Sequence, residues 1–238
     1  MNIILFEQID SEGIVPKSDF RYEHIIKVLH LQEGDTFSMG RVNGPSGLAT
    51  ILAVDNEGLR YSWEVTNDCV PLYPVTLMVA QVRPICMKRI LREAVSLGVH
   101  SIVVTGTDTG EKSYRDAKLW STGEYRKYLL DGAMQSSFTG IPELTCFDTI
   151  DEALESHSDT DNKIVLDNVE GSDPLSSFEY RKGSVLLAIG PERGWSERER
   201  MLFPEHAFEF RLLGKRTLRT ETACSAGLAV LLSRMRLL

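Results

Sequence analysis

Two continuous apolar runs constrain the fold of this chain more than any other feature. Residues 75–82 read VTLMVAQV and residues 184–190 read SVLLAIG. A strand that is buried on both faces of a sheet has this pattern, whereas a strand with one face in solvent alternates between apolar and polar residues. Between the runs, the helical periodicity of residues 87–99 is followed by another short apolar run at 101–106. The pattern predicts an α/β domain with a mostly parallel sheet.

The other elements of this domain are predicted in the same way. Short apolar runs bounded by turn residues indicate strands, and apolar residues spaced three or four apart indicate helices. The remaining expected elements are strands at 143–147, 163–167 and 207–214 and helices at 115–137, 150–157, from Ser196 onward and 222–237.

Residues 1–70 have a different pattern. Helical periodicity is confined to residues 21–31, where Ile25, Val28 and Leu29 share one face. The rest is rich in short, roughly alternating runs that turn residues separate. These runs lie at 35–42, 47–54 and 59–66. The region is predicted to form a small β-barrel that carries one short helix.

A linker is expected between the two patterns. Residues 67–74, NDCVPLYP, contain two prolines in eight positions. A length of 238 residues suits one large domain or two modest ones. The predicted domains are therefore residues 1–70 and residues 71–238.

Composition narrows the class of protein. The chain is 42% hydrophobic and 25% charged, and no apolar run approaches the roughly 18 residues of a membrane span. The N-terminus, MNIILFEQID, is too short and too acidic for a signal peptide. The four cysteines form no C-x-x-C pair, and the five histidines form no metal-ligand motif. We expect a soluble cytoplasmic protein with no membrane segment and no metal.

The charge is unevenly distributed along the chain. The net charge is −8, which argues against indiscriminate binding to nucleic acid. Residues 178–238, however, carry 11 Lys and Arg against 7 Asp and Glu. Arg211, Lys215, Arg216 and Arg219 lie close together there. Such a cluster is either a solvated face or a surface that meets a polyanion.

Two predicted strands end in glycine turns. The first ends at Gly190 and the second at Gly214, and ligands of open α/β sheets lie beyond the carboxyl ends of the strands. A tight turn alone would explain either glycine. A known nucleotide-phosphate motif is absent from both turns, and Glu192 would repel a phosphate. A ligand with a cationic centre and an adenosine, such as S-adenosylmethionine, suits turns lined by Ile189 and Leu213.

The two helices after these turns begin differently. Ser196 and Glu199 form the S-x-x-E pattern of a capping box. Thr220 is predicted to cap the last helix, and Glu221 suits the positive end of the helix dipole. Arg219 places a cation at that positive end, which is locally unfavourable and indicates a functional role.

These segments together resemble one family. LLAIGPERGWSERE is similar to a GPEGG-F-S-x-E signature, and LLGKRTLRTETA is similar to L-G-x-R-I-L-R-x-E-T-A. Three weaker matches, YEHIIKVLHLQEGD, ILREAVSLGV and GAMQSS, occur in the same order. The chain resembles the bacterial ribosomal RNA small subunit methyltransferase E family of the SPOUT superfamily. It departs from the pattern at Arg193, which replaces the second glycine of GPEGG, and at His30, which replaces an arginine.

The resemblance implies both a fold and an activity. The fold would combine an N-terminal PUA-like β-barrel with a C-terminal parallel sheet that contains a deep trefoil knot. The activity would be S-adenosylmethionine-dependent methylation of N3 of one uridine in 16S ribosomal RNA within the small subunit, by a homodimer. Two alternatives stay open: methylation of another RNA position, such as a ribose hydroxyl, and an RNA-binding assembly factor that has lost catalysis.

The resemblance and the strand-end argument together assign site residues. Arg219 is predicted to stabilise the uridinate, and Glu221 to orient Arg219 or the cofactor. The predicted cofactor-binding residues are Leu166, Ile189, Gly190, Pro191, Glu192, Gly194, Leu212, Leu213, Gly214, Leu218, Thr222 and Ala223. The predicted RNA-binding residues are Arg21, His24, Lys27, Arg193 and Arg216.

Overall fold

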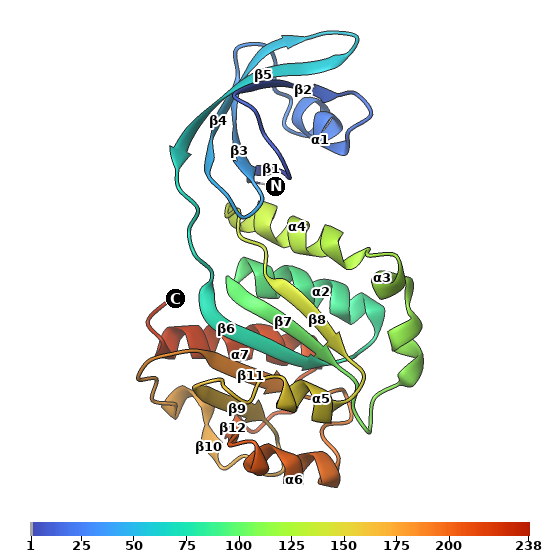
Figure 1. The fold of residues 1–238 in the computed structure, drawn as a ribbon, viewed down its shortest axis with the longest axis vertical. Coiled ribbons are helices and arrows are strands. Elements are labelled where there is room, and N and C mark those ends of the chain that lie inside the picture. The colour runs from blue at the N-terminus through green and yellow to red at the C-terminus, as the bar shows by residue number, and fades with distance from the viewer. Residues whose placement is uncertain (1) are drawn as a thin grey trace. The chain divides into compact units, whose positions relative to one another are not determined.

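The computed structural model describes residues 2–238, which form two compact units (Figure 1). The first unit contains the chain up to Pro71 together with Ala133–Ile141. The second contains Leu72–Gly132 and Pro142–Leu238. The predicted boundary at residue 70 therefore leaves out Ala133–Ile141, the second stretch of the first unit.

The first unit is built on a five-stranded sheet in the order β1-β3-β4-β5-β2. Strands β1 and β3 pair in parallel, and the other neighbours pair antiparallel. Its core is apolar and includes Ile4, Val15, Ile25, Met39 and Leu59. The elements are β1 (Ile4–Phe6), β2 (Glu12–Pro16), α1 (Phe20–Glu23), a π-helical turn (His24–Val28), β3 (Thr36–Arg41), β4 (Ser46–Val54) and β5 (Gly58–Asn67).

The second unit is built on a seven-stranded sheet in the order β10-β12-β9-β11-β6-β7-β8. All of its strand pairs are parallel, so the predicted α/β class is confirmed. Its strands are β6 (Tyr73–Ala80), β7 (Val99–Thr105), β8 (Glu143–Phe147), β9 (Asn162–Leu166), β10 (Asp173–Pro174), β11 (Val185–Ile189) and β12 (Glu209–Leu212). Its helices are α2 (Pro84–Ser96), α3 (Lys118–Ser121), α4 (Tyr125–Ser136), α5 (Ile150–Glu155), α6 (Glu197–Glu205) and α7 (Thr220–Arg234), with 3-10 turns at Lys112–Asp116 and Leu175–Ser177. The end of α4, from Ala133 onward, belongs to the first unit.

The two runs that predicted buried strands form the centre of this sheet. Strands β6 and β11 are neighbours, and all five residues of β11 are buried. Leu186 and Ala188 pack into a cluster that contains residues of α5 and α6. Leu187 and Ile189 point to the other face, where they lie beside Gly227 of α7. Because successive side chains of a strand point to opposite faces, helices on both faces require an apolar residue at every position.

Two predicted elements differ from the structure. The helix expected at 115–137 is interrupted, because Gly123 adopts a φ of +73° between α3 and α4. The strand expected at 207–214 is shortened to β12, and the residues after it turn toward the next helix. None of the helices within residues 2–238 is long and apolar enough to cross a membrane.

Candidate functional site

The parallel strands of the second unit end at one edge of the sheet, and a cavity of about 250 Å³ lies there. Three strand ends contribute to it, those of β9, β11 and β12. We call it the first cavity. It is lined by Leu166, Asp167, Asn168, Val169, Ile189, Gly190, Pro191, Glu192, Arg193, Gly194, Trp195, Arg200, Arg211, Leu213, Arg216, Thr217, Leu218, Thr220 and Ala223.

The loop from Gly190 to Ser196, which follows β11, is fixed by its own contacts. Trp195 is only 2% exposed, and its Nε1 donates a hydrogen bond of 3.1 Å to the carbonyl oxygen of Leu166. A Cβ atom at Gly190 would lie 3.1 Å from the Trp195 ring, so a glycine permits this close packing. The loop is thereby held against the end of β9.

The helix after this loop begins as the sequence predicts. The Ser196 hydroxyl accepts from the Glu199 amide at 3.1 Å, and Glu199 Oε2 accepts from the Ser196 amide at 2.7 Å. The capping box is therefore confirmed.

The loop from Leu213 to Arg219, which follows β12, is open to solvent. Residues 214–219 are all exposed, and Gly214 adopts a φ of +141°. Helix α7 begins at Thr220, and Arg219 precedes it as a cap residue whose side chain makes no capping hydrogen bond. Arg219 therefore lies at the positive, N-terminal end of α7, as the sequence predicts.

The predicted capping role of Thr220 is wrong. Thr220 is the first residue of α7, is 4% exposed, and directs its hydroxyl away from the helix amides. The hydroxyl donates a hydrogen bond of 3.2 Å to the carbonyl oxygen of Gly190. Since a buried hydroxyl needs a partner, this bond takes precedence over capping and joins the two loops.

Asp167 is a cavity residue that the sequence reasoning missed. Its side chain is 2% exposed and accepts a 2.9 Å hydrogen bond from Nε of Arg200. It also accepts from the amides of Val169 and Glu170. Because Asp167 directly follows β9, the rule that ligands lie beyond strand ends could have identified it. Trp195 and Arg200 carry no comparable sequence signal.

A second cavity of about 540 Å³ adjoins the first, since Glu192 and Arg193 line both. It is lined by Arg83, Cys86, Thr109, Gly110, Glu111, Tyr114, Glu192, Arg193, Arg219 and Glu221. A hydrogen bond with Tyr114 raises the pKa of Arg83. Burial, and then the neighbouring Glu221 carboxylate, raises the pKa of the Cys86 thiol. The second cavity is thus lined by three arginines, Arg83, Arg193 and Arg219.

The predicted site residues of the second unit divide between the two cavities. Leu166, Ile189, Gly190, Pro191, Glu192, Gly194, Leu213, Leu218 and Ala223 line the first cavity. Arg219 and Glu221 line the second, Arg193 lines both, and Arg216 lines the first. Leu212, Gly214 and Thr222 line neither cavity. The sequence reasoning also missed Arg83 and Tyr114, which come from distant segments.

The three predicted RNA-binding residues of the first unit lie on its helical segment. The Arg21 guanidinium forms a fork with Asp19 at 2.8 and 2.6 Å and lies 4.0 Å above the Phe6 ring. Burial lowers the pKa of His24, whose Nε2 is buried without a hydrogen-bond partner among residues 2–238. Lys27 is exposed and pairs with Glu23. Arg21 therefore has a clear structural role, and of the three Lys27 is the most accessible.

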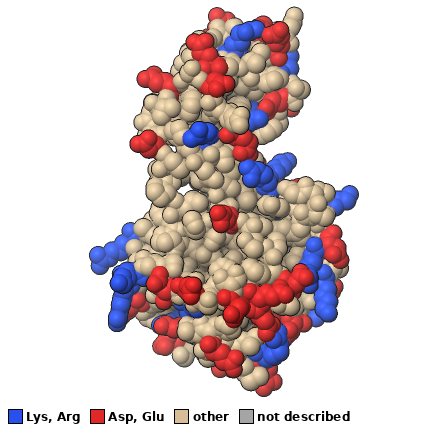
Figure 2. All heavy atoms as spheres, viewed as in Figure 1, with Lys and Arg blue, Asp and Glu red and all other residues tan. Residues whose placement is uncertain are grey.

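The surface charge of the second unit is mixed. On the face in Figure 2, basic side chains lie toward both sides of this unit and acidic side chains occupy much of the band between them. Within residues 2–238, no three His, Cys, Asp or Glu side chains are grouped so as to hold a metal ion.

Comparison with known proteins agrees with this architecture. Residues 69–232 match the family model of an RNA methyltransferase domain. A ribosomal RNA small subunit methyltransferase E from Treponema pallidum is 37% identical, over 98% of this chain and 91% of that protein. A protein named ribosomal RNA small subunit methyltransferase E 1 from Borreliella burgdorferi is 28% identical, over 99% of each.

Solved structures have the same fold. A ribosomal RNA small subunit methyltransferase E from Neisseria gonorrhoeae, bound to S-adenosyl methionine, superposes with a TM-score of 0.80 at 21% identity, over 98% of this chain and 97% of that one. A putative methyltransferase from Legionella pneumophila, also in complex with that cofactor, superposes with a TM-score of 0.81 at 22% identity, over 98% of this chain and 97% of that one.

The parallel sheet and the matched domain thus define an RNA methyltransferase fold. Within that class, the relatives match almost the whole chain. The chain belongs to the ribosomal RNA small subunit methyltransferase E family.

Proposed function

We propose that this chain transfers a methyl group from S-adenosylmethionine to N3 of a uridine in 16S ribosomal RNA within the small subunit, in the cytoplasm. One observation carries the proposal: a cavity between two strand-end loops adjoins a second cavity that contains Arg219. The activity for which the relatives are named and the S-adenosyl methionine bound to the two similar structures support it.

The first cavity fits S-adenosylmethionine. Ile189, Leu213 and Leu218 offer apolar contacts for the adenosine, and Gly190 also lines the cavity. When bound, S-adenosylmethionine supplies an electrophilic methyl group.

Arg219 is the residue that we assign to the transition state. Transfer to N3 requires loss of the imide proton, and a nearby cation favours the anion that results. Arg219 lies in the second cavity beside Glu221, with Arg83 and Arg193 in the same lining. A positive charge that is fixed before the reaction stabilises developing negative charge without reorganisation. We assign to Glu221 the orientation of Arg219 or of the cofactor.

Residues that contact RNA are proposed on both units. Arg193 and Arg216 lie at the cavities, and Lys27 is accessible on the first unit together with His24 and Arg21. The mostly antiparallel sheet of the first unit supports a PUA-like barrel as an RNA-binding module. Because the net charge is −8, we expect RNA to be bound by a limited basic patch and not through general affinity for RNA. We also expect the substrate to be an assembled small subunit and not free RNA.

We also propose a trefoil knot and a homodimer. The chain leaves β12 on the far side of β9, yet α7 returns to pack against β11, β6 and α2. This return path and the bond between Thr220 and Gly190 support a knotted crossing, which an experimental trace of the two loops would test. Helix α7 keeps Ala226, Ala229 and Val230 partly exposed, which supports a self-association surface. Light scattering at micromolar concentration should give a dimer mass.

Methyl transfer to small subunits that lack the modification tests the proposed function. The tritiated methyl group should enter 16S ribosomal RNA, and mass spectrometry of a nucleoside digest should find 3-methyluridine. A ribose-methylated nucleoside would reject the N3 position. An absence of transfer, with no binding of S-adenosylhomocysteine, would reject the enzyme and leave an assembly factor.

A further inference from the structure

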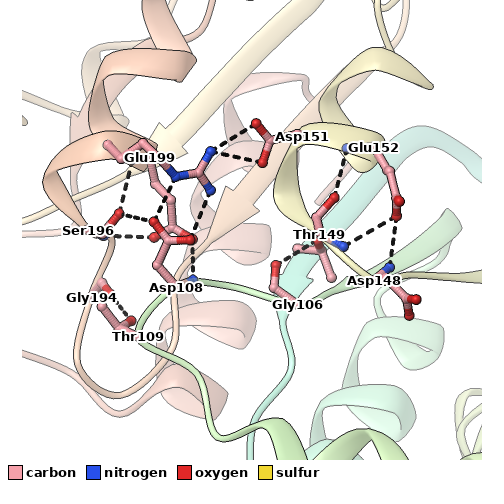
Figure 3. Close-up of polar contacts among 12 residues, drawn as sticks. Gly106, Asp108, Thr109, Asp148, Thr149, Asp151, Glu152, Gly194, Ser196 and Glu199 are labelled. Carbon is pink, nitrogen blue, oxygen red and sulfur yellow. Dashed lines mark hydrogen bonds and ion pairs between the residues drawn. The ribbon is translucent and has the colours of Figure 1, made fainter.

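A third loop connects the two cavities. Residues 106–111 follow β7, and Thr109, Gly110 and Glu111 of this loop line the second cavity. The hydroxyl of Thr109 donates a hydrogen bond of 2.7 Å to the carbonyl oxygen of Gly194, which lines the first cavity. Figure 3 shows this bond beside a larger polar cluster around Asp108. A single side chain therefore links the walls of both cavities.

Glu199 links the same two loops through a second set of hydrogen bonds. It is 0% exposed, and its two oxygens have different partners. Oε2 accepts from the Ser196 amide at 2.7 Å, as a capping box requires. Oε1 accepts from the Asp108 amide at 2.8 Å, in a segment about 90 residues earlier in the chain. Capping explains only the first bond, and since burying a carboxylate is costly, the second bond indicates a further role.

Asp108 completes the connection at the surface. Its carboxylate accepts from the Ser196 hydroxyl at 2.6 Å and from Nε and Nη2 of Arg198 at 2.9 Å each. Arg198 also contacts Asp151, the second residue of α5. The Arg198 side chain is 47% exposed, so solvent weakens its ion pairs. The bonds of Glu199 and Thr109 are partly buried and are therefore the stronger part of the link.

We infer that Thr109 and Glu199 are positioning residues that couple the cofactor loop at 190–196 to the loop at 106–111, so that cofactor and RNA each favour binding of the other. The inference rests on the proposed function, because it takes the first cavity for the cofactor and the second for the RNA. Cofactor contacts with Gly194 restrict the residual motion of a loop that is already held in place, and through the bond to Thr109 they restrict the loop at 106–111, which forms one wall of the second cavity. By linkage, RNA that orders this wall raises the affinity for the cofactor by the same factor.

The test measures this factor directly. The dissociation constant of tritiated S-adenosylhomocysteine is determined by equilibrium dialysis, with and without saturating small subunits that lack the modification. In the wild type, we expect subunits to tighten binding about five-fold or more, the lower end of typical couplings. In Thr109→Val, binding without subunits should stay within about two-fold, while the coupling factor should fall toward one. The single-turnover rate on subunits should fall as well.

Thr107→Val is the matched control. Thr107 lies in the same loop, and its hydroxyl is buried without a hydrogen-bond partner within residues 2–238. The substitution removes an equivalent hydroxyl without removing a link, so the coupling factor should equal that of the wild type. Glu199→Gln is a second probe, because an amide leaves one of the two backbone donors without an acceptor. Its coupling factor should also fall, in protein whose circular dichroism is that of the wild type.

The outcomes separate the two proposals. If the wild type neither binds S-adenosylhomocysteine nor methylates subunits, the proposed function fails. If the wild type does both, the inference is overturned by any of three results: equal affinity with and without subunits, wild-type coupling in both Thr109→Val and Glu199→Gln, or an equal loss in Thr107→Val.

Discussion

The two loops that border the first cavity are held in different ways. The loop at 190–196 is fixed by the buried Trp195, by the capping box of Ser196 and by the bond from Thr109 to Gly194. The loop at 213–219 has exposed residues from Gly214 onward and meets the first loop through Thr220. One wall of the cavity is therefore formed in advance, and the other is free to adapt.

This difference separates two tasks. A fixed wall keeps the cost of ordering low when the cofactor binds, because the loop has little freedom to lose. An open loop that carries Arg219 can close over a large RNA and supply its charge to the reacting base. Substitutions in the first loop should therefore affect folding and cofactor binding, whereas substitutions in the second should affect turnover and RNA binding.

Arg219→Ala should have the largest effect on activity. If the charge of Arg219 acts mainly in the transition state, single-turnover methylation should fall by roughly 10²–10³. Binding of S-adenosylhomocysteine, measured by calorimetry, should stay within a few-fold of the wild type. Arg219→Lys should recover only part of the rate, because an ammonium lacks the planar fork of a guanidinium. Lower thermal stability with an unchanged single-turnover rate would instead assign Arg219 a structural role.

Trp195→Phe and Leu218→Ala form a pair that compares the two walls. Trp195→Phe removes the bond to Leu166 and leaves space in a tightly packed cluster, so the free energy of unfolding should fall by about 1–3 kcal/mol. Leu218 is 39% exposed, and its truncation should change stability by less than about 0.5 kcal/mol while weakening cofactor binding. Urea denaturation and calorimetry measure both quantities. Equal losses of stability would contradict the distinction.

Lys215→Ala and Arg216→Ala should have moderate effects on RNA binding. Both residues are exposed on the open loop. If each contacts one phosphate, each substitution should lower the salt dependence of binding to small subunits by about one in slope. Filter binding over a range of salt concentrations measures the slope. Lys182→Ala, at another exposed position, is the control and should leave the slope unchanged. If Lys182→Ala lowers the slope as much as Lys215→Ala does, the effect is not specific to the loop at 213–219.

The smallest effect should be a dependence of stability on pH through Asp108. Hydrogen bonds from Arg198, and then from Ser196, lower the pKa of Asp108 below its ordinary value. A carboxyl whose pKa is lower in the folded state stabilises the fold above its unfolded pKa, and loses that contribution as the pH falls through its folded pKa. Solvent screening limits the contribution to about 1 kcal/mol or less. Asp108→Asn should therefore be less stable than the wild type at pH 7, with a difference that narrows below about pH 4. A constant difference across this range would contradict the assignment.

The fold was largely predictable from the sequence, because strands that are buried on both faces of the sheet, such as β6 and β11, appear in the sequence as continuous apolar runs. The short strands β1 and β10 were not predicted, since three and two residues are too few to show a period. Of the two strand-end glycines, Gly190 lines the first cavity, whereas Gly214 does not. Thr220 was misassigned because its partner, the carbonyl of Gly190, comes from a distant segment. The same reason hid Arg83 and Tyr114 of the second cavity.

Hydrogen–deuterium exchange with and without S-adenosylhomocysteine tests the contrast between the two loops most directly. Without ligand, the amides of 190–196 should already exchange slowly, because the loop is fixed by its own contacts, whereas those of 213–219 should exchange fast. Ligand should slow the exchange of 213–219 strongly and that of 190–196 little. Fast exchange of 190–196 in the free protein, or ligand protection that leaves 213–219 unchanged, would contradict a cavity with one fixed wall and one adaptable wall.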